Sequence, residues 1–348
     1  MSNEHKKAKS DILTRRKFLR SSVRAGLAGL AAPALAGGWL GSAHGASDRG
    51  RAYSQGLYGL ELDGVFMGFA SAVSGGDVFG EVVVEKPGPD RIQRKHVAGL
   101  KVEPISLDLS LPMAKPFYAW LKSTFEPGAK PMAKSGALLT LDYDRKVIAR
   151  REFANALITE VEFPVCDAAS KDASTLGVTF LPERIATVAT PVPGAAISHA
   201  AAARWLAAHF RLNIQGLEAA TVRASRVEAF TVKSQVSLDP VGERRDYAPQ
   251  RVSLEIPNLV VTISEAHARP FYDWHSEFVI RGNNGQDRER VGVLEYLAPD
   301  LKSVLLAVNF FNLGIFRAAP EPAVVHAENI RRMKASMYCE AISVDFKV

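Results

Sequence analysis

The sequence predicts a mainly β (α+β) protein built from two tandem antiparallel β-barrel or β-sandwich domains, each with one helix, joined by a short linker helix. The chain has 348 residues, of which 47% are hydrophobic, and this is enough to give each of two domains its own core. One aromatic heptad occurs twice, at 114–120 and 268–274. The residues before each heptad alternate between apolar and polar side chains, which is typical of half-buried strands.

Residues 1–46 are expected to form an export leader. Arg15 and Arg16 are adjacent, and the hydrophobic pair Phe18 and Leu19 follows at close spacing. This segment resembles the twin-arginine export motif. We therefore expect the twin-arginine translocase as a partner during export, and a periplasmic or secreted location for the folded protein.

The residues after this motif predict that the leader is removed. A weakly apolar stretch rich in Ala and Gly runs from Ala25 to about Ala43. Small side chains at Ala43, Gly45 and Ala46 suit cleavage by a signal peptidase. The alternative is a permanent membrane anchor, because about 19 apolar residues can just span a bilayer. Cleavage is favoured, since Ala and Gly contribute little transfer free energy and Pro33 interrupts the stretch.

The positive charge of the chain belongs to the leader. The formal net charge is +6, but residues 1–46 hold eight basic and two acidic side chains, so the chain's 43 basic and 37 acidic residues leave 35 of each in the remainder. The remainder is formally neutral, and no nucleic-acid partner is predicted. Cys166 and Cys339 could form one disulfide bond outside the cytoplasm, but two cysteines are too few for a disulfide framework.

Three matches in the same order predict a tandem duplication. Residues 60–64 match 212–216, and residues 153–155 match 310–312, on either side of the repeated heptad. The repeated core positions of the two heptads are Pro116, Phe117, Tyr118 and Trp120, then Pro270, Phe271, Tyr272 and Trp274. One heptad could match by chance, but three ordered matches favour duplication. The expected organisation is the leader at 1–46, a first domain at 56–186, a linker with an Ala-rich helix at 187–207, and a second domain at 208–348.

The expected linker has two parts. Thr190–Gly194 contains two prolines, which remove backbone donors and favour an irregular connection. Ile197–Phe210 then predicts a short helix, with Ser198 as a possible N-cap and Trp205 and Leu206 on its apolar side.

Both domains predict the same order of elements. A strand leads into the aromatic heptad, whose proline suits the first turn of a helix. A hairpin and a final strand follow the helix. The hairpin strands are expected at 137–141 with 147–162 and at 291–297 with 303–316, and the final strands at 175–181 and 335–344. Antiparallel strands with one apolar face must close around a core, so we expect the helix to lie across the open end of a barrel or sandwich.

Segments of the first domain carry a family resemblance. They are the strand Val102–Leu111, the helix Phe117–Leu121, and Phe153–Ala156 leading to Asp172–Ser174, with Glu183 after the final strand. With these segments the domain resembles the tail-tube protein family of contractile bacteriophages, which is related in fold to the secreted tube protein of type VI secretion. The likeness covers most of 57–185 and, more weakly, 210–346.

The resemblance implies a structural role. Subunits of this family form six-fold rings, so two fused domains imply a homo-oligomer of three chains in a pseudo-hexameric ring. The resemblance also implies that Glu85–Arg91 is the long loop that reaches the next ring, and an ordinary surface hairpin is the alternative. The sequence departs from the family in two respects, because family subunits usually have one domain and carry no export leader.

No catalytic residue, cofactor site or metal site is predicted. Ser74 lies in a segment close to G-x-S-x-G, but Ala72 replaces the first Gly, and a strand is expected at 78–84 where a nucleophile elbow needs a helix. His267 and His275 flank the second heptad without a ligand-type partner at helical spacing. The aromatic side chains of the first heptad are expected in the core rather than in a carbohydrate platform.

Three functional hypotheses remain. The leading one is an exported, non-catalytic structural protein that assembles into rings or tubes. The alternative is a periplasmic binding or adaptor module of the same fold that does not polymerise. The third is a secreted hydrolase, for which Ser74 is the only candidate nucleophile.

Overall fold

The computed structural model describes residues 57–347 apart from 90, 112, 126–130, 189–196, 198–204, 241–246 and 323–329. The chain divides into two compact units, Met1–Ala52 and Tyr53–Val348, and every described residue belongs to the second. The leader predicted at 1–46 and most of the predicted linker therefore lie outside the described residues. Among the described residues, no helix combines the length and the apolar character needed to cross a membrane.

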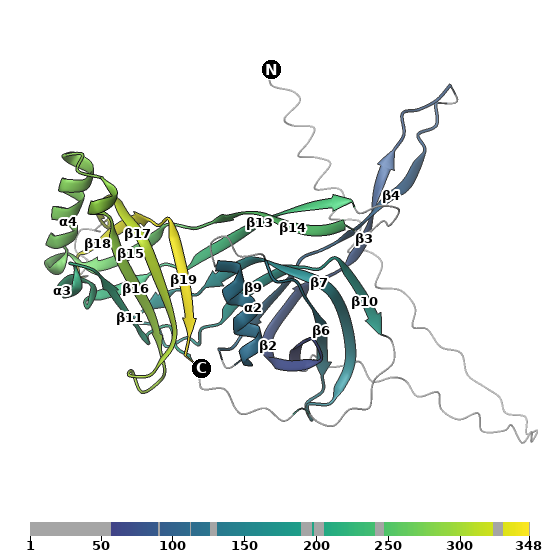
Figure 1. Cartoon of the computed structure of the whole chain (residues 1–348), viewed down its shortest axis with the longest axis horizontal. Helices are drawn as coiled ribbons and strands as arrows, with labels where there is room; N and C mark the ends of the chain where they lie inside the picture. The colour runs from purple at the N-terminus through teal and green to yellow at the C-terminus, as the bar shows by residue number, and fades with distance from the viewer. Residues whose placement is uncertain are drawn as a thin grey trace, which may run out of the picture. The chain divides into compact units, whose positions relative to one another are not determined.

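The first large sheet closes into a barrel. The strand order β7-β6-β1-β2-β5-β9 returns to β7, because β7 pairs with β6 along its first half and with β9 along its second (Figure 1). β10 also pairs with β7. The strands of this barrel are β1 (Leu57–Leu62), β2 (Val65–Gly75), β5 (Ile105–Leu109), β6 (Lys134–Leu141), β7 (Val147–Phe163), β9 (Leu176–Leu181) and β10 (Arg184–Val188).

The second large sheet repeats most of this arrangement but does not close in its described part. Its order is β11-β16-β17-β18-β15-β12-β8, and β19 pairs with β17. β11 and β12 do not pair, and the short helix α3 (Glu218–Thr221) lies between them in sequence. The strands are β8 (Cys166–Asp167), β11 (Phe210–Ile214), β12 (Ala224–Val227), β15 (Leu259–Ser264), β16 (Arg290–Leu297), β17 (Val304–Pro320), β18 (Arg332–Tyr338) and β19 (Ala341–Phe346). The prediction of a mainly β, two-domain fold with few helices is confirmed.

The two sheets share pairings and irregularities. The pairs β1–β6, β6–β7, β7–β9, β5–β9 and β7–β10 correspond to β11–β16, β16–β17, β17–β18, β15–β18 and β17–β19. The register shifts between Ile158 and Glu160 on β7, and between Ile315 and Arg317 on β17. Asn155 and Asn312 adopt positive φ angles of 49° and 56°, a conformation that asparagine tolerates better than most residues. These features recur at one offset of 157 residues.

Each aromatic heptad forms a helix that buries one face. In α2 (Lys115–Phe125), Pro116 is exposed at the start, while Phe117, Tyr118 and Trp120 are buried. In α4 (Arg269–His275), proline stands at the start again and fits the first turn, where no backbone donor is needed. There Phe271 and Trp274 are buried, and Pro270 and Tyr272 are half-buried. The chain continues from α4 into a π-helical turn, η2 (Ser276–Ile280).

Two predictions about secondary structure were wrong. The linker helix is not formed at Trp205–Phe210, because Leu206 makes a β-bridge with Ala173 and β11 begins at Phe210. Trp205 is instead buried against Tyr296, with ring centroids 4.9 Å apart. The rest of that helix, including Ser198, lies outside the described residues. The single final strand predicted at 335–344 is two strands, β18 and β19, which a break at residues 339–340 separates.

Candidate assembly surfaces

Strands are exchanged between the two sheets. β13 (Phe230–Pro240) and β14 (Tyr247–Glu255) form a hairpin that comes after β12 in sequence but pairs with β7 of the barrel. In the opposite direction, β8 leaves the barrel and pairs with β12. Residues 160–162 of β7 pair with both β9 and β13, so β13 lies on the edge of β7 opposite β9. The two sheets are therefore joined by backbone hydrogen bonds as well as by side chains.

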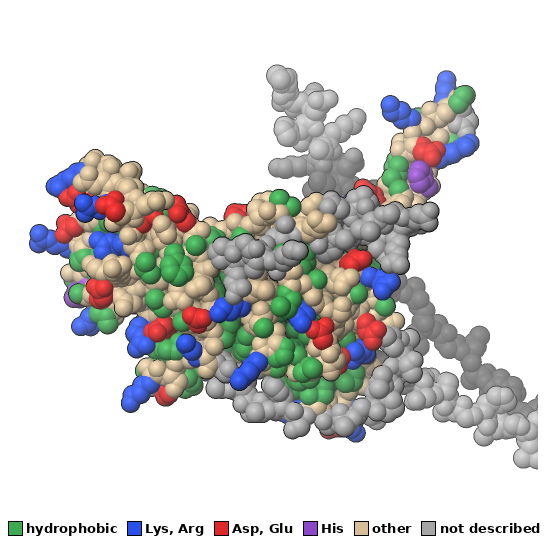
Figure 2. Space-filling view, viewed as in Figure 1, with side chains coloured by type: hydrophobic (Ala, Val, Ile, Leu, Met, Phe, Trp, Pro, Cys, Tyr) green, Lys and Arg blue, Asp and Glu red, His purple; other side chains and the backbone are tan. Residues whose placement is uncertain are grey.

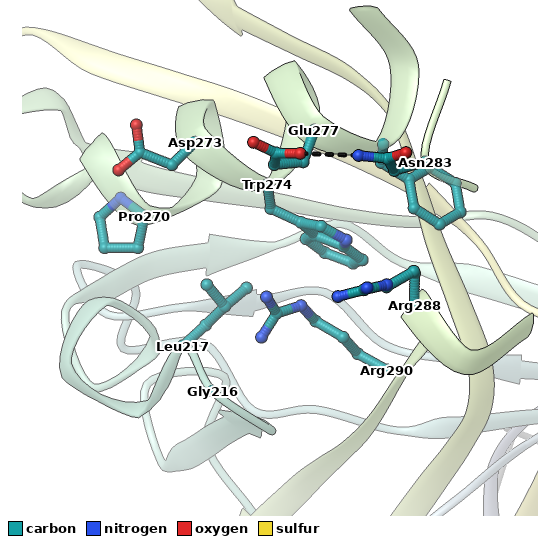
Figure 3. Close-up of a pocket in the computed structure, with 10 residues that line it drawn as sticks. Gly216, Leu217, Pro270, Asp273, Trp274, Glu277, Asn283, Arg288 and Arg290 are labelled. Carbon is teal, nitrogen blue, oxygen red and sulfur yellow. Dashed lines mark hydrogen bonds between the residues drawn. The ribbon is translucent and has the colours of Figure 1, made fainter. Parts of the chain in front are cut away.

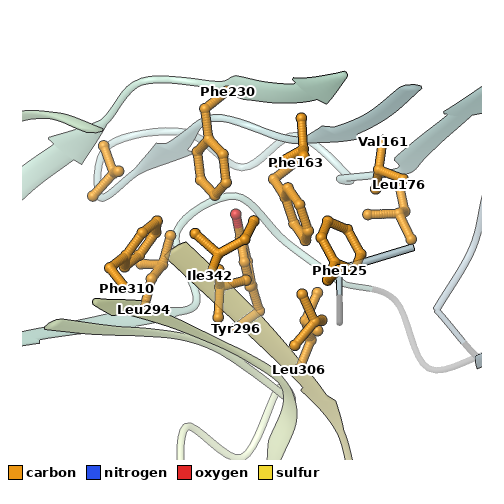
Figure 4. Close-up of a cluster of buried hydrophobic side chains, with 14 of the residues drawn as sticks. Phe125, Val161, Phe163, Leu176, Phe230, Leu294, Tyr296, Leu306, Phe310 and Ile342 are labelled. Atoms are coloured by element: carbon orange, nitrogen blue, oxygen red, sulfur yellow. The ribbon is translucent and has the colours of Figure 1, made fainter. Parts of the chain in front are cut away.

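A shared aromatic cluster fills the junction between the sheets (Figure 4). The rings of Phe163 and Phe230 stack with centroids 4.8 Å apart. Phe230 also meets Phe310 of β17 edge-on at 5.6 Å, and Phe163 lies 6.0 Å from Phe125 at the end of α2. Aromatic pairs in these arrangements add about 0.5–1.5 kcal/mol beyond the burial of their surface. The cluster makes one continuous core out of the two sheets.

Polar contacts also cross the junction. Arg226 of β12 forms ion pairs with Asp167 of β8 at 2.9 Å and with Glu228 at 3.1 Å, and these two carboxylates raise the pKa of Arg226. Lys233 of β13 lies 3.6 Å from Glu160 of β7. Such half-exposed pairs contribute about 0–1 kcal/mol each, so they fix register more than they add stability.

A second hairpin has no such partner in the described part of the chain. β3 (Val78–Val84) and β4 (Lys95–Val102) pair only with each other and form a separate two-stranded sheet. All of β3 is exposed, and hydrophobic side chains lie on the hairpin beside charged ones (Figure 2). An isolated hairpin is at best marginally stable in water. Exposed strand edges with apolar side chains also mark interaction sites.

The two hairpins are built alike. Each carries an extra residue at the same place, since the register shifts between Glu81 and Val82 in the first and between Gln235 and Val236 in the second. These positions differ by 154 residues, which is also the offset between the two aromatic heptads. Every residue of β3, and every residue of β4 except Val102, can therefore be matched to one of β13 and β14.

The matched positions differ strongly in exposure. Val232 is 1% exposed where the hairpin lies on β7, whereas the matching Val78 is 45% exposed. Ser234 is buried, whereas the matching Gly80 is exposed. Alternate residues of a strand share one face, so these positions belong to a single face that is covered in the second hairpin and open in the first.

A cavity of about 440 Å³ is lined by the aromatic helix α4, the turn after β11 and the start of β16 (Figure 3). The guanidinium of Arg290 lies over the ring of Trp274, with its carbon 4.8 Å from the ring centroid, and donates to the carbonyl of Gln215 at 2.5 Å. Burial lowers the pKa of Arg290. Trp274 Nε1 and Arg290 Nε are buried and make no hydrogen bond among the described residues. Glu277 and Asn283 pair on the opposite wall at 2.9 Å.

The residues weighed as catalytic or metal-binding candidates are not brought together. Ser74 lies within β2, and the strand β3 follows where an elbow needs a helix. Among the described residues, no group of three or more His, Cys, Asp or Glu side chains could hold a metal ion, and this includes His267 and His275. Cys166 and Cys339 are both buried free thiols. Burial raises the pKa of Cys166 to about 12 and that of Cys339 to about 11.

Some features of these surfaces were missed by sequence reasoning. Glu85–Arg91 was singled out as a loop, but the exposed apolar strands on either side of it were not. The signal was present, because Val78–Val84 holds five large hydrophobic residues beside a long loop. Sequence reasoning also missed Arg290, whose guanidinium packs on Trp274. No sequence signal pointed to this contact.

Comparisons with known proteins give matches to solved structures. No family model matches the sequence, and no curated protein matches it. The sheath-tube complex of an extracellular contractile injection system (PVC, extended state) matches with 16% identity and a TM-score of 0.36, over 41% of this chain and 95% of that chain. The baseplate of the anti-feeding prophage matches with 12% identity and a TM-score of 0.32, over 40% and 93%. Hcp1 from Flavobacterium johnsoniae matches with 10% identity and a TM-score of 0.25, over 39% and 94%.

Proposed function

We propose that this chain is an exported, non-catalytic structural protein of the tail-tube type, in which a duplicated β unit assembles with further copies of the chain into rings. Three chains would supply six units and form a pseudo-hexamer. The twin-arginine translocase would export the folded chain to the periplasm or beyond, with Arg15, Arg16, Phe18 and Leu19 as the export signal and cleavage near Ala43–Ala46.

One observation carries this proposal. The β13–β14 hairpin of the second β unit (residues 208–348) lies on a strand edge of the first β unit (residues 56–186), and the first β unit has a matching hairpin, β3–β4. A contact that uses different surfaces on its two sides is head-to-tail, and repeated head-to-tail contacts form a closed ring or an open filament. Within one chain the contact is made once. This leaves one hairpin and one unit edge for further copies.

The duplication itself is supported by details that strand order alone would not produce. The register shifts on β7 and β17, the positive φ angles of Asn155 and Asn312, and the extra residues in both hairpins all recur at matching positions. We infer that the two units descend from one repeated sequence with boundaries near 56–186 and 208–348. The repeated heptads support the same boundaries.

The test is the assembly state of the purified full chain. Analytical ultracentrifugation at rising concentration is expected to show trimers or larger species, and electron microscopy is expected to show rings or short tubes. A strictly monomeric protein at high concentration would contradict the proposal. A ring with a number of chains other than three would support the assembly but contradict the pseudo-hexamer of three chains.

A second candidate function is a periplasmic binding or adaptor module that does not polymerise. The cavity beside Trp274 and Arg290 favours it, because two buried donors there have no partner in the described part of the chain. An acidic group would satisfy both donors. Monomeric behaviour, together with a ligand whose binding is lost in Arg290→Ala, would support this function over assembly.

A further inference from the structure

The open face of the β3–β4 hairpin is the starting point, and the inference rests on the proposed ring assembly. The covered face of the β13–β14 hairpin includes Val232 and Ser234, which are buried. The matching face of the β3–β4 hairpin includes Val78, Val82 and Leu100, which are 45%, 58% and 41% exposed. The same face is thus buried in the β13–β14 hairpin and open to solvent in the β3–β4 hairpin.

The second unit offers the matching edge. On β7, residues 160–163 pair with β13, and the edge opposite to β13 is held by β9. The equivalent residues of β17 are 317–320, which pair with β18 on one edge. No described strand pairs with their other edge. A cavity of about 170 Å³ lies over this part of β17 and the neighbouring β18, lined in part by Arg317, Ala319 and Lys334.

From these two observations we propose that the β3–β4 hairpin of one chain adds to the free edge of β17 in a second copy of the same chain. The register follows from the pairing of β13 with β7, in which Lys233 stands opposite Glu160 and Val232 opposite Val161. Shifted by the offsets of the two repeats, Phe79 stands opposite Arg317, and Val78 stands opposite Ala318.

The side chains of the two surfaces are complementary. Arg317 is exposed and forms no ion pair or hydrogen bond among the described residues. In the proposed register its guanidinium faces the ring of Phe79, a favourable cation–π arrangement. Glu81, which pairs with Lys101 at 3.0 Å, lies two residues further along the same face of β3, at a diagonal distance that an arginine can span. The open apolar face of the hairpin meets the second unit as Val232 meets the first.

Disulfide cross-linking tests the register directly. Directly opposed residues in antiparallel strands have Cα atoms about 4.5–5.5 Å apart, within the range that a disulfide bond needs. The test variant is Phe79→Cys with Arg317→Cys. Its matched control is Lys233→Cys with Glu160→Cys, which occupies the same positions of the contact that already exists within one chain. Both native cysteines are buried, so they interfere with neither variant.

Mild oxidation of the full chain is expected to link chains in the test variant and to link only within a chain in the control. If the ring closes with three chains, the covalent product stops at a trimer on a denaturing gel, and an open filament gives a ladder instead. Each single cysteine variant is expected to give neither product. A Phe79–Arg317 disulfide within a single chain would overturn the inference.

A second variant works even if the introduced cysteines disturb the surface. Val82→Glu places a charge on the open face, and it is expected to lower the association constant at least tenfold with no change in the unfolding midpoint. Val222→Glu, at a 70% exposed valine outside the hairpin, is the matched control and is expected to leave association unchanged. If the chain assembles equally well with Val82→Glu, the proposed contact between the β3–β4 hairpin and β17 is wrong, but the proposed ring assembly is not contradicted. If the unaltered chain is a monomer, the proposed function fails as well.

Discussion

Phe163 of β7 and Phe230 of β13 stack with their ring planes 20° apart, although they lie 67 residues apart in the sequence. Phe230 begins the strand that leaves its own unit and joins the other. The pair therefore ties the exchanged hairpin to the shared core. Substitution of this pair tests most directly whether the two sheets unfold together or independently.

Phe230→Ala is expected to lower the free energy of unfolding by about 3–5 kcal/mol, because a buried phenylalanine is removed from a packed aromatic cluster. Denaturation in urea, followed by circular dichroism, measures the effect. Since the Phe230 side chain contacts residues of both sheets, we expect residues 57–347 to unfold in a single transition at a lower urea concentration. A loss below about 1 kcal/mol, or a loss confined to one of two separate transitions, would show that the exchange does not couple the units.

Glu61→Gln is expected to cost about 1.5–3 kcal/mol, the range for hydrogen bonds to charged groups. Arg150 donates two hydrogen bonds to the Glu61 carboxylate, at 2.6 and 3.0 Å, and this carboxylate raises the pKa of Arg150. The matched control is Glu81→Gln, whose partner Lys101 lies 3.0 Å away in a half-exposed pair. The control is expected to cost about 0–1 kcal/mol. If both variants lose the same free energy of unfolding, neither the burial of the Glu61–Arg150 pair nor its two hydrogen bonds adds to its stability.

Asn312→Ala is expected to cost about 1–2 kcal/mol, since alanine adopts the positive φ of 56° less readily than asparagine and a hydrogen bond is lost. The Asn312 amide donates to Glu289 at 2.7 Å. Asn312→Gly removes the same hydrogen bond without the strain, so it is expected to cost less than alanine does. Urea midpoints of the two variants decide the point. A glycine variant less stable than the alanine variant would show that the backbone conformation is not the cause.

Alkaline pH is expected to destabilise the protein through Cys166. Burial raises the pKa of this thiol from 9.0 to about 12. The folded state holds the proton more tightly than the unfolded chain does, so the contribution is complete below pH 9 and is lost as the pH rises from 9 towards 12. Denaturation midpoints of the unaltered protein should fall between pH 8 and 10 by more than those of Cys166→Ala.

Alkylation gives an independent check of the same thiol. At pH 8, a pKa of about 12 leaves the thiolate at a fraction on the order of one in ten thousand, and the side chain is buried as well. Iodoacetamide is therefore expected to modify Cys166 only after unfolding, as mass spectrometry can show. Rapid labelling in the native protein would place Cys166 on the surface instead.

The parts of the fold that sequence periodicity predicted are those that local patterns determine. Alternation before the aromatic heptads predicted β5 and β15, and the heptads themselves predicted α2 and α4. The prediction of a linker helix was wrong because Trp205 packs on Tyr296, a residue 91 positions away, and no local pattern encodes this contact.

The exchange of β13 and β14 could not be predicted for a related reason. Alternation shows that a strand has one buried face, but it does not show which sheet covers that face. The matching hairpin β3–β4 also has apolar residues on the corresponding face, at Val78 and Val82, and yet all of β3 is exposed. The cavity residue Arg290 likewise depends on a tertiary contact, since its guanidinium lies over the ring of Trp274 in α4.

The exchanged hairpin also fixes an order of events during synthesis. Residues 160–163 of β7 keep one bare edge until the ribosome has translated Lys233, the last residue of β13 that pairs with them, 70 residues after β7 itself is complete. The nascent amino-terminal barrel can close through β7 and β9, but this other edge of β7 stays uncovered until a strand encoded far downstream has been made. A chain that stalls before that point leaves on β7 an open edge equivalent to the edge of β17 to which we assign intermolecular pairing.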